Sequence, residues 1–266
     1  LEGFSSIIPE NVKDSNIPAV GFKLKVMGSK KGLIAVSFPN VVGSNPIGRI
    51  NEEINDGEFF GVRFKHNHLL EFDPNNGEVS ILTDKKPEYL IPQYNINVDA
   101  VTAMSTFIWK DRYETNKPWK AIINREEYKE EIHEVTGFWD DPAGIIALPY
   151  EENEEVKFVV SWYARGKWIQ YPYGFYYHNI FSNSVEVGKY FLREFDRLEK
   201  ESKSIHDINV DLPEWLKDAI INSAYTLSSS TILDEKGRFG IFEAPEVCPC
   251  VSTIGGLCYE GNLPII

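Results

Sequence analysis

The sequence is poor in cysteine and has no long apolar run, and each shortage excludes a class of protein. Only three of its 266 residues are cysteines, Cys248, Cys250 and Cys258. An odd, clustered set is not a disulfide framework, so we expect reduced thiols. No apolar run approaches the roughly 20 residues that a membrane-spanning helix needs. The first residues also lack the basic head and apolar core of a secretory signal, which favours a cytoplasmic location.

Basic residues are outnumbered as well. The chain has 27 Lys and Arg against 40 Asp and Glu, which gives a net charge of -13 and a pI near 4.9. A nucleic-acid-binding protein places Lys and Arg on phosphates, so this chain would mostly repel nucleic acid. Neutral or polar small ligands fit it better. Hydrophobic residues still make up 42% of the chain, enough for the core of one large or two ordinary domains.

Short apolar runs separated by Gly, Pro and Asn dominate the first two-thirds of the chain. This texture predicts an antiparallel β-sandwich. A loop at Gly28–Gly32 predicts a hairpin between the first two strands, and Asp73–Gly77 is dense in turn residues. The expected strands are Val20–Val26, Leu33–Phe38, Phe59–Lys65, Leu69–Phe72, Val79–Leu82, Val101–Trp109, Ile145–Leu148 and Val156–Tyr163.

The pattern changes to a helical one near Ser182. Apolar residues then recur at steps of three and four, which predicts an amphipathic helix of about five turns. They are Val187, Tyr190, Phe191, Phe195 and Leu198. A polar connector follows, and a second helix opens near Pro213. The chain begins without Met and ends in an apolar run, so we expect the native polypeptide to continue at both ends.

Three groups of residues superficially suggest metal sites. His66 and His68 would face the same side of a strand, but no further ligands are indicated nearby. The three cysteines match no closed four-ligand spacing, and Asp73–Glu78 lacks the full spacing of a calcium loop. Ordinary strand histidines, incidental thiols and a turn explain them better, so we expect neither a metal nor a cofactor.

Aromatic residues are concentrated between Phe138 and Phe191. Aromatic faces bury the apolar faces of sugars, and Tyr and Trp add a polar group. The same residues fill cores and domain interfaces, which is the expected role for most of them. Trp168 and Tyr173 lie in a loop containing Gly and Pro, where contact with a ligand is more favoured.

Two carboxylates three residues apart, Glu243 and Glu246, follow the second helix. Glycoside hydrolysis needs a pair of carboxylates across the scissile bond. This spacing has little specificity, and by itself it favours surface acids.

Four segments, taken in order, resemble glycoside hydrolase family 116, the family of the non-lysosomal glucosylceramidase and of microbial β-glucosidases and β-xylosidases. The resemblance rests on Ser15–Val20, on Phe158–Tyr163 with the helix from Tyr190 to Glu201, on Leu212–Lys217 and on Phe239–Glu246. It implies a β-sandwich that leads into an (α/α)6 barrel, and a retaining mechanism. The chain would then hold a sandwich domain at 1–180 without its first strands, a linker helix and connector at 181–210, and the beginning of the helical catalytic domain at 211–266.

The resemblance implies specific site residues. Glu246 corresponds to the family's nucleophile, and Glu243 and Thr253 are candidate substrate contacts. Trp168 and Tyr173 are the further candidate contacts, from the aromatic loop rather than from the resemblance. The family's acid/base aspartate lies beyond Ile266, so a missing segment or a partner chain would supply it. The family also tends to carry Asn-Thr-x-Asp after the nucleophile, where this chain has Ser252 and Gly255; this departure weakens the expected sugar contacts.

The sequence therefore predicts a fragment of a retaining β-glycosidase, similar to a β-glucosidase or glucosylceramidase, that alone is incomplete and inactive. Its partner would be a carbohydrate or glycoside substrate. The alternative is a non-catalytic β-sandwich module that binds carbohydrate or another protein, and a purely structural domain is a third reading. The surroundings of Glu246 discriminate between them: a cavity floor lined with aromatic residues favours the enzyme, and an exposed flank favours the module.

Overall fold

The computed structural model describes residues 1–95, 117–129, 131–137, 140–165, 173–206, 211–223, 230–244 and 248–252. The chain forms two compact units. The first comprises 1–5, 18–171 and 181–195, and the second comprises 6–17, 172–180 and 196–266. Within the described parts of the chain, no helix is long and apolar enough to cross a membrane.

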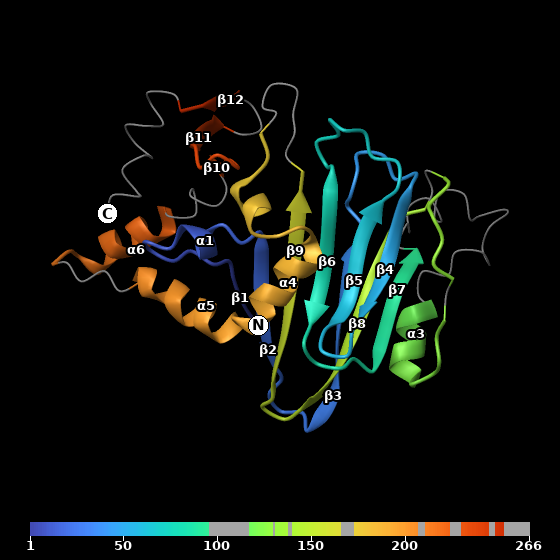
Figure 1. Ribbon diagram of the computed structural model, residues 1–266. Coiled ribbons are helices and arrows are strands. Elements are labelled where there is room, and N and C mark those ends of the chain that lie inside the picture. The colour runs from blue at the N-terminus through green and yellow to red at the C-terminus, as the bar shows by residue number, and fades with distance from the viewer. Residues whose placement is uncertain are drawn as a thin grey trace. The chain divides into compact units, whose positions relative to one another are not determined.

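The first unit is built on two antiparallel sheets (Figure 1). The larger has the strand order β1-β2-β9-β6-β5-β4, and the smaller has the order β3-β8-β7. The strands are β1 (Glu2–Phe4), β2 (Ala19–Lys25), β3 (Lys31–Pro39), β4 (Arg49–Asn55), β5 (Phe60–His66), β6 (Gly77–Thr83), β7 (Tyr89–Asn95), β8 (Pro142–Glu151) and β9 (Glu155–Ala164). The expected β-rich antiparallel architecture is thereby confirmed.

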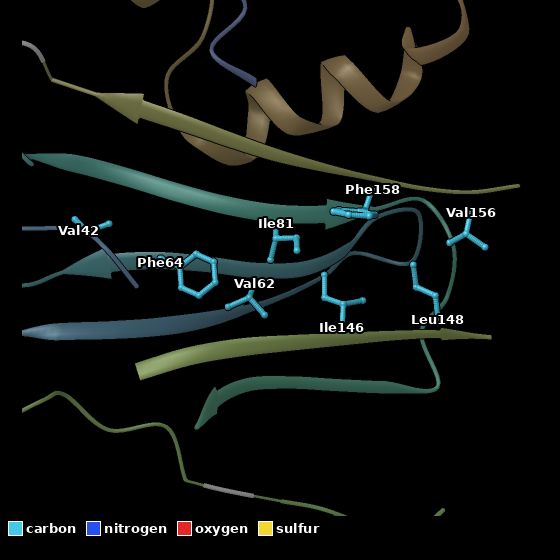
Figure 2. Packing of buried hydrophobic residues seen from close by; sticks show 8 residues of the cluster. All are labelled: Val42, Val62, Phe64, Ile81, Ile146, Leu148, Val156 and Phe158. Carbon is cyan, nitrogen blue, oxygen red and sulfur yellow. The ribbon is translucent and has the colours of Figure 1, made fainter. Parts of the chain in front are cut away.

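The main core lies between the two sheets (Figure 2). Alternate residues of β5 and β6 point from the larger sheet toward β8 of the smaller one. The buried cluster comprises Val42, Val62, Phe64, Ile81, Ile146, Leu148, Val156 and Phe158. At about 25 cal/mol per Å² of apolar area, each such side chain stabilises the fold by about 1.5–3 kcal/mol.

A helix covers the outer face of each sheet. On the smaller sheet, Ile122 of α3 (Lys117–Asn124) packs in a second cluster with Ile145 and Ala147 of β8. Strand β8 is therefore buried on both faces, which explains its continuous apolar run. On the larger sheet, α4 (Ser184–Arg193) lies against β6 and β9. Ser184 Oγ is 2.5 Å from Ser80 Oγ of β6.

Among the described strands, four connections cross from one sheet to the other: β2–β3, β3–β4, β6–β7 and β8–β9. Strand β2 pairs with β9 and β1, whereas β3 pairs with β8, so the hairpin predicted at Gly28–Gly32 is wrong. Phe22 and Ile34 pack against the same core cluster from opposite sheets, which a hairpin would not allow. The β8–β9 turn crosses the sheets likewise, and the Glu152 N–H donates to Lys30 O at 2.8 Å between this crossing and the β2–β3 crossing.

Several expected elements differ from the structure. Leu69–Phe72 is not a strand but part of a turn, in which Asn76 Nδ2 donates to Leu70 O at 2.9 Å. The single long helix is divided at Glu194 into α4 and α5 (Phe195–Ser202). Val101–Trp109 lies outside the described residues. Strands β1, β4 and β7 and helix α3 were not predicted.

In its described residues, the second unit holds short helices and a small sheet. The helices are α1 (Val12–Ser15), η1 (Tyr176–Asn179), η2 (Lys203–His206) and α6 (Glu214–Ser223), and the unit also contains α5 from Asp196 onward. Arg197 of α5 pairs at 3.0 Å with the buried carboxylate of Asp14 in α1. The sheet has the order β10-β11-β12, with strands Thr231–Leu233, Phe239–Ala244 and Cys248–Val251. The helical barrel and the domain division at 180 and 210 stay predictions.

Candidate functional site

The strand that carries Glu243 begins at a tight turn built on one buried carboxylate. Asp234 is fully buried, and its Oδ1 accepts the backbone N–H groups of Lys236 and Arg238 at 2.9 Å each. Its Oδ2 accepts Arg238 Nε–H at 2.6 Å. Gly237, at φ +75°, supplies the left-handed residue of the turn. The sequence Asp-Glu-Lys-Gly therefore closes the β10–β11 hairpin by an ordinary turn mechanism.

This turn is held on one side by the segment that follows Tyr173. The backbone N–H of Glu235 donates to Gly174 O at 3.0 Å, and its carbonyl accepts from Asn179 Nδ2 at 2.9 Å. Phe175 and Asp234 form an antiparallel bridge. The chain before α4 thus continues the hydrogen bonding of the small sheet.

Side chains reinforce the same contact. His178 Nδ1 lies 2.9 Å from Glu235 Oε1, and the imidazole is 12% exposed. The rings of Phe175 and Tyr177 stack at 5.2 Å, and both meet His178 edge-on. We name residues 173–179 together with the turn 234–238 the hairpin clamp.

Tyr173 contacts the turn through its aromatic face. Lys236 Nζ lies 4.5 Å and Arg238 Cζ lies 4.0 Å from the ring centroid, within the range of cation–π attraction. The hydrogen bond to Asp234 is the main reason that the pKa of Arg238 is raised above its ordinary value. Tyr173, predicted as a substrate contact, therefore has two cations of its own chain against its ring.

Glu243 and Tyr173, two of the predicted site residues, both lie at the β10–β11 hairpin, but at opposite ends of it. Glu243 lies in β11, and at about 3.3 Å per residue it is about 13 Å along the strand from Phe239. Tyr173 is at the turn end of the same hairpin. Glu246, Thr253 and Trp168 lie outside the described residues, so the predicted surroundings of Glu246 stay a prediction.

Strand β12 returns after Glu246. Ala244 pairs with Cys248, and Phe242 pairs with Val251 across a bulge. Ser252 donates its backbone N–H to Ile241 O at 2.7 Å. Glu246 therefore follows β11 and precedes β12 in the chain, and these two strands pair with each other.

Sequence reasoning missed most of the clamp. His178, Asp234, Glu235 and Arg238 carry no spacing that links them, because the two segments are more than fifty residues apart. Only the turn signal around Gly237 could have been used, and it indicates a hairpin without indicating what holds it.

His66, the last residue of β5, and His68, in the loop after it, form a separate cluster in the first unit. His66 Nδ1 accepts the backbone N–H of His68 at 3.0 Å, and His68 Nε2 lies 2.7 Å from Glu134 Oε1. The hydrogen bond from Asn67, followed by that from His68, lowers the pKa of Glu134. In the described part of the chain, no group of three His, Cys, Asp or Glu side chains could hold a metal ion.

Comparison with known proteins identifies the first unit. A family model described as "beta-glucosidase 2, glycosyl-hydrolase family 116 N-term" matches residues 1–198. No curated protein matches the chain. The matched region contains both sheets, which the resemblance assigned to the sandwich, and α4, which it assigned to the linker. The chain belongs to glycosyl hydrolase family 116, through the N-terminal domain of that family.

Proposed function

We propose that the chain carries the sandwich and the nucleophile segment of a retaining β-glycosidase that hydrolyses β-linked glucosides. The observation that carries this proposal is the family match over 1–198, followed in the chain by the hairpin that leads to Glu246. The proposal includes the division into a sandwich at 1–180, a linker at 181–210 and the start of a helical catalytic domain at 211–266. It also includes a cytoplasmic location.

Glu246 acts as the nucleophile in this proposal. Its carboxylate attacks the anomeric carbon, the bond from that carbon to the aglycone oxygen breaks, and the bonding electron pair leaves with the oxygen. A second carboxyl group about 5 Å away protonates the leaving oxygen. Water then cleaves the glycosyl ester, and the second carboxylate accepts its proton. This second group comes from a further segment of the protein or from a partner chain.

Glu243, Thr253, Trp168 and Tyr173 are the proposed substrate contacts. For Tyr173, the cations on its ring favour contact through its edge or hydroxyl group rather than through a free face. The aglycone is of the glucosylceramide type or another β-glucoside.

Intact-mass spectrometry with 2,4-dinitrophenyl 2-deoxy-2-fluoro-β-glucoside tests the proposal. The activated leaving group needs little acid assistance, so the missing acid/base residue is less of an obstacle. We expect a mass gain of one fluoroglucosyl unit that peptide mapping places on Glu246. Glu246→Gln should abolish the label, whereas the matched variant Glu243→Gln should keep it at a lower rate.

A second candidate is a non-catalytic module that binds carbohydrate or another protein. It is favoured by the fact that the family match covers the N-terminal domain alone. Absence of label on the 266-residue chain, together with saturable binding of a β-glucoside, would support it. Absence of label on a longer natural form of the protein would contradict the glucosidase proposal itself.

A further inference from the structure

We infer that the hairpin clamp sets the position of the proposed nucleophile segment, and that His178, Asn179 and Glu235 are positioning residues. The inference rests on the proposed function. The clamp ties the turn end of the β10–β11 hairpin to residues 173–179, and the other end, where β11 pairs with β12, leads to Glu243 and Glu246.

The clamp is built to fix an orientation as well as to fold a turn. Asp234 and Gly237 already close the turn by themselves. Two further hydrogen bonds hold the backbone of Glu235: its N–H donates to Gly174 O, and its C=O accepts from Asn179 Nδ2. Because both backbone groups of Glu235 are hydrogen-bonded and its side chain contacts His178, the hairpin has little freedom to rock about its turn.

Gly174 shows how closely the two segments approach. A Cβ atom at this position would lie 2.0 Å from Glu235 Oε1 and 2.3 Å from His178 Nδ1. A larger residue here would therefore require the Glu235 side chain or the His178 ring to move.

Variants of the full chain test the inference in two independent ways. Glu235→Ala removes the side-chain contact with His178, and Asn179→Ala removes the hydrogen bond to Glu235 O. Gly174→Ala forces His178 and Glu235 apart. Glu214→Ala is the matched control, because Glu214 forms an ion pair with Lys217 on α6, at 2.9 Å, outside the clamp. His178→Gln keeps a donor toward Glu235, whereas His178→Ala does not.

The first readout is amide hydrogen exchange of residues 239–244, which does not depend on activity. We expect about tenfold faster exchange in the clamp variants, since each loses a hydrogen bond that holds the turn. The control and His178→Gln should exchange like the wild type. Unchanged exchange in all clamp variants would overturn the inference.

The second readout is the rate of labelling by the fluoroglucoside as a function of its concentration. Misplacement of the nucleophile should lower the maximal rate about tenfold and leave the half-saturating concentration unchanged. Faster exchange with an unchanged maximal rate would reduce the clamp to a structural contact and overturn the inference. If neither the 266-residue wild type nor a longer natural form takes label, the proposed function fails and the positioning role fails with it, while the exchange data still report whether the clamp holds the strand.

Discussion

At the scale of single residues, Asp56 shows how one exposed loop is tied to a helix. Its carboxylate accepts the backbone N–H of Phe59 at 2.8 Å and forms an ion pair with Lys189 of α4. The hydrogen bond to Lys189, followed by that from Phe59, lowers the pKa of Asp56 to about 2 from an ordinary value of 3.8.

This shift makes the contribution of Asp56 depend on pH. Between about pH 4 and pH 2 the unfolded chain binds a proton at Asp56 while the folded chain does not, so stability falls as the pH is lowered through this window. Asp56→Asn should therefore lower the free energy of unfolding at pH 5 and lose this effect by pH 2. The side chain is 41% exposed, so screening keeps the effect small.

Urea unfolding of both proteins at pH 5, 4, 3 and 2.5 measures the difference. Glu58→Gln, in the same loop, controls for the loss of one surface carboxylate. A difference between wild type and Asp56→Asn that stays constant over this range would contradict the assignment.

Other residue-scale features could not be predicted because they join distant segments. Asn40 and Asn51 are buried, and Asn40 Nδ2 donates to Asn51 Oδ1 at 2.9 Å. The backbone N–H of Asn51 donates to Gln93 Oε1 at 3.2 Å, and Gln93 is buried too. In the sequence these amides resemble exposed loop residues. Only the stacking of the sheets makes them partners, since a buried amide requires hydrogen bonds.

At the scale of elements, α4 is fixed to the larger sheet by small polar residues. Ser161 Oγ–H donates to Ser184 O at 2.9 Å, and Glu78 Oε1 accepts the Ser184 N–H at 2.7 Å. Asn183 caps the helix by accepting from the Glu186 N–H at 2.9 Å. A helix seated this closely needs a residue without a side chain, and Gly188 supplies it.

Gly188→Ala tests that close packing. Alanine is favoured over glycine in a helix by about 1 kcal/mol. A Cβ at position 188 would, however, lie 2.6 Å from Leu82 Cδ1 and 2.8 Å from Ser161 Oγ. Overpacking costs about 1–3 kcal/mol, so we expect a net loss of about 1 kcal/mol in urea unfolding.

The loss should be smaller in a Leu82→Ala background, because the nearest side chain is then removed. A stabilising effect of Gly188→Ala in the wild-type background would show that α4 does not lie this close to the sheet.

The elements that sequence reasoning found and missed differ in how they are buried. Strands β5, β6, β8 and β9 carry continuous or alternating apolar residues, and they were predicted. Strand β4 is an edge strand in which Glu52 and Glu53 interrupt the pattern, and β7 contains Pro92 within a register shift. The break between α4 and α5 at Glu194 has no signature in the sequence either. Phe191, Phe195 and Leu198 keep the three- and four-residue spacing of a continuous helix across it, and all three are buried.

At the scale of the whole molecule, net charge governs association in solution. The charge is -13 at pH 7 and vanishes near pH 4.9, where Asp56 still stabilises the fold. We expect light scattering to be lowest near pH 7 and highest near pH 5, with an unchanged circular dichroism spectrum. A scattering maximum above pH 6 would contradict this expectation.

The candidate site was predictable only as far as its chemistry is local. The order of Phe239 and Glu243 indicated the family segment, and the structure places both in β11. The clamp from His178 and Asn179 depends on the fold of the second unit and has no local signature.

Two of the crossings between the sheets, β2–β3 and β8–β9, have a consequence for synthesis on the ribosome. Ala19 pairs with Ser161, and Lys31 pairs with Glu151, so the earliest strands have partners that are made last. At about 5–20 residues per second, the roughly 140 residues between β2 and β9 take about 7–28 s to emerge. During that interval β2 and β3 cannot form their final pairs, and their apolar faces are available to chaperones until the β8–β9 turn has left the exit tunnel.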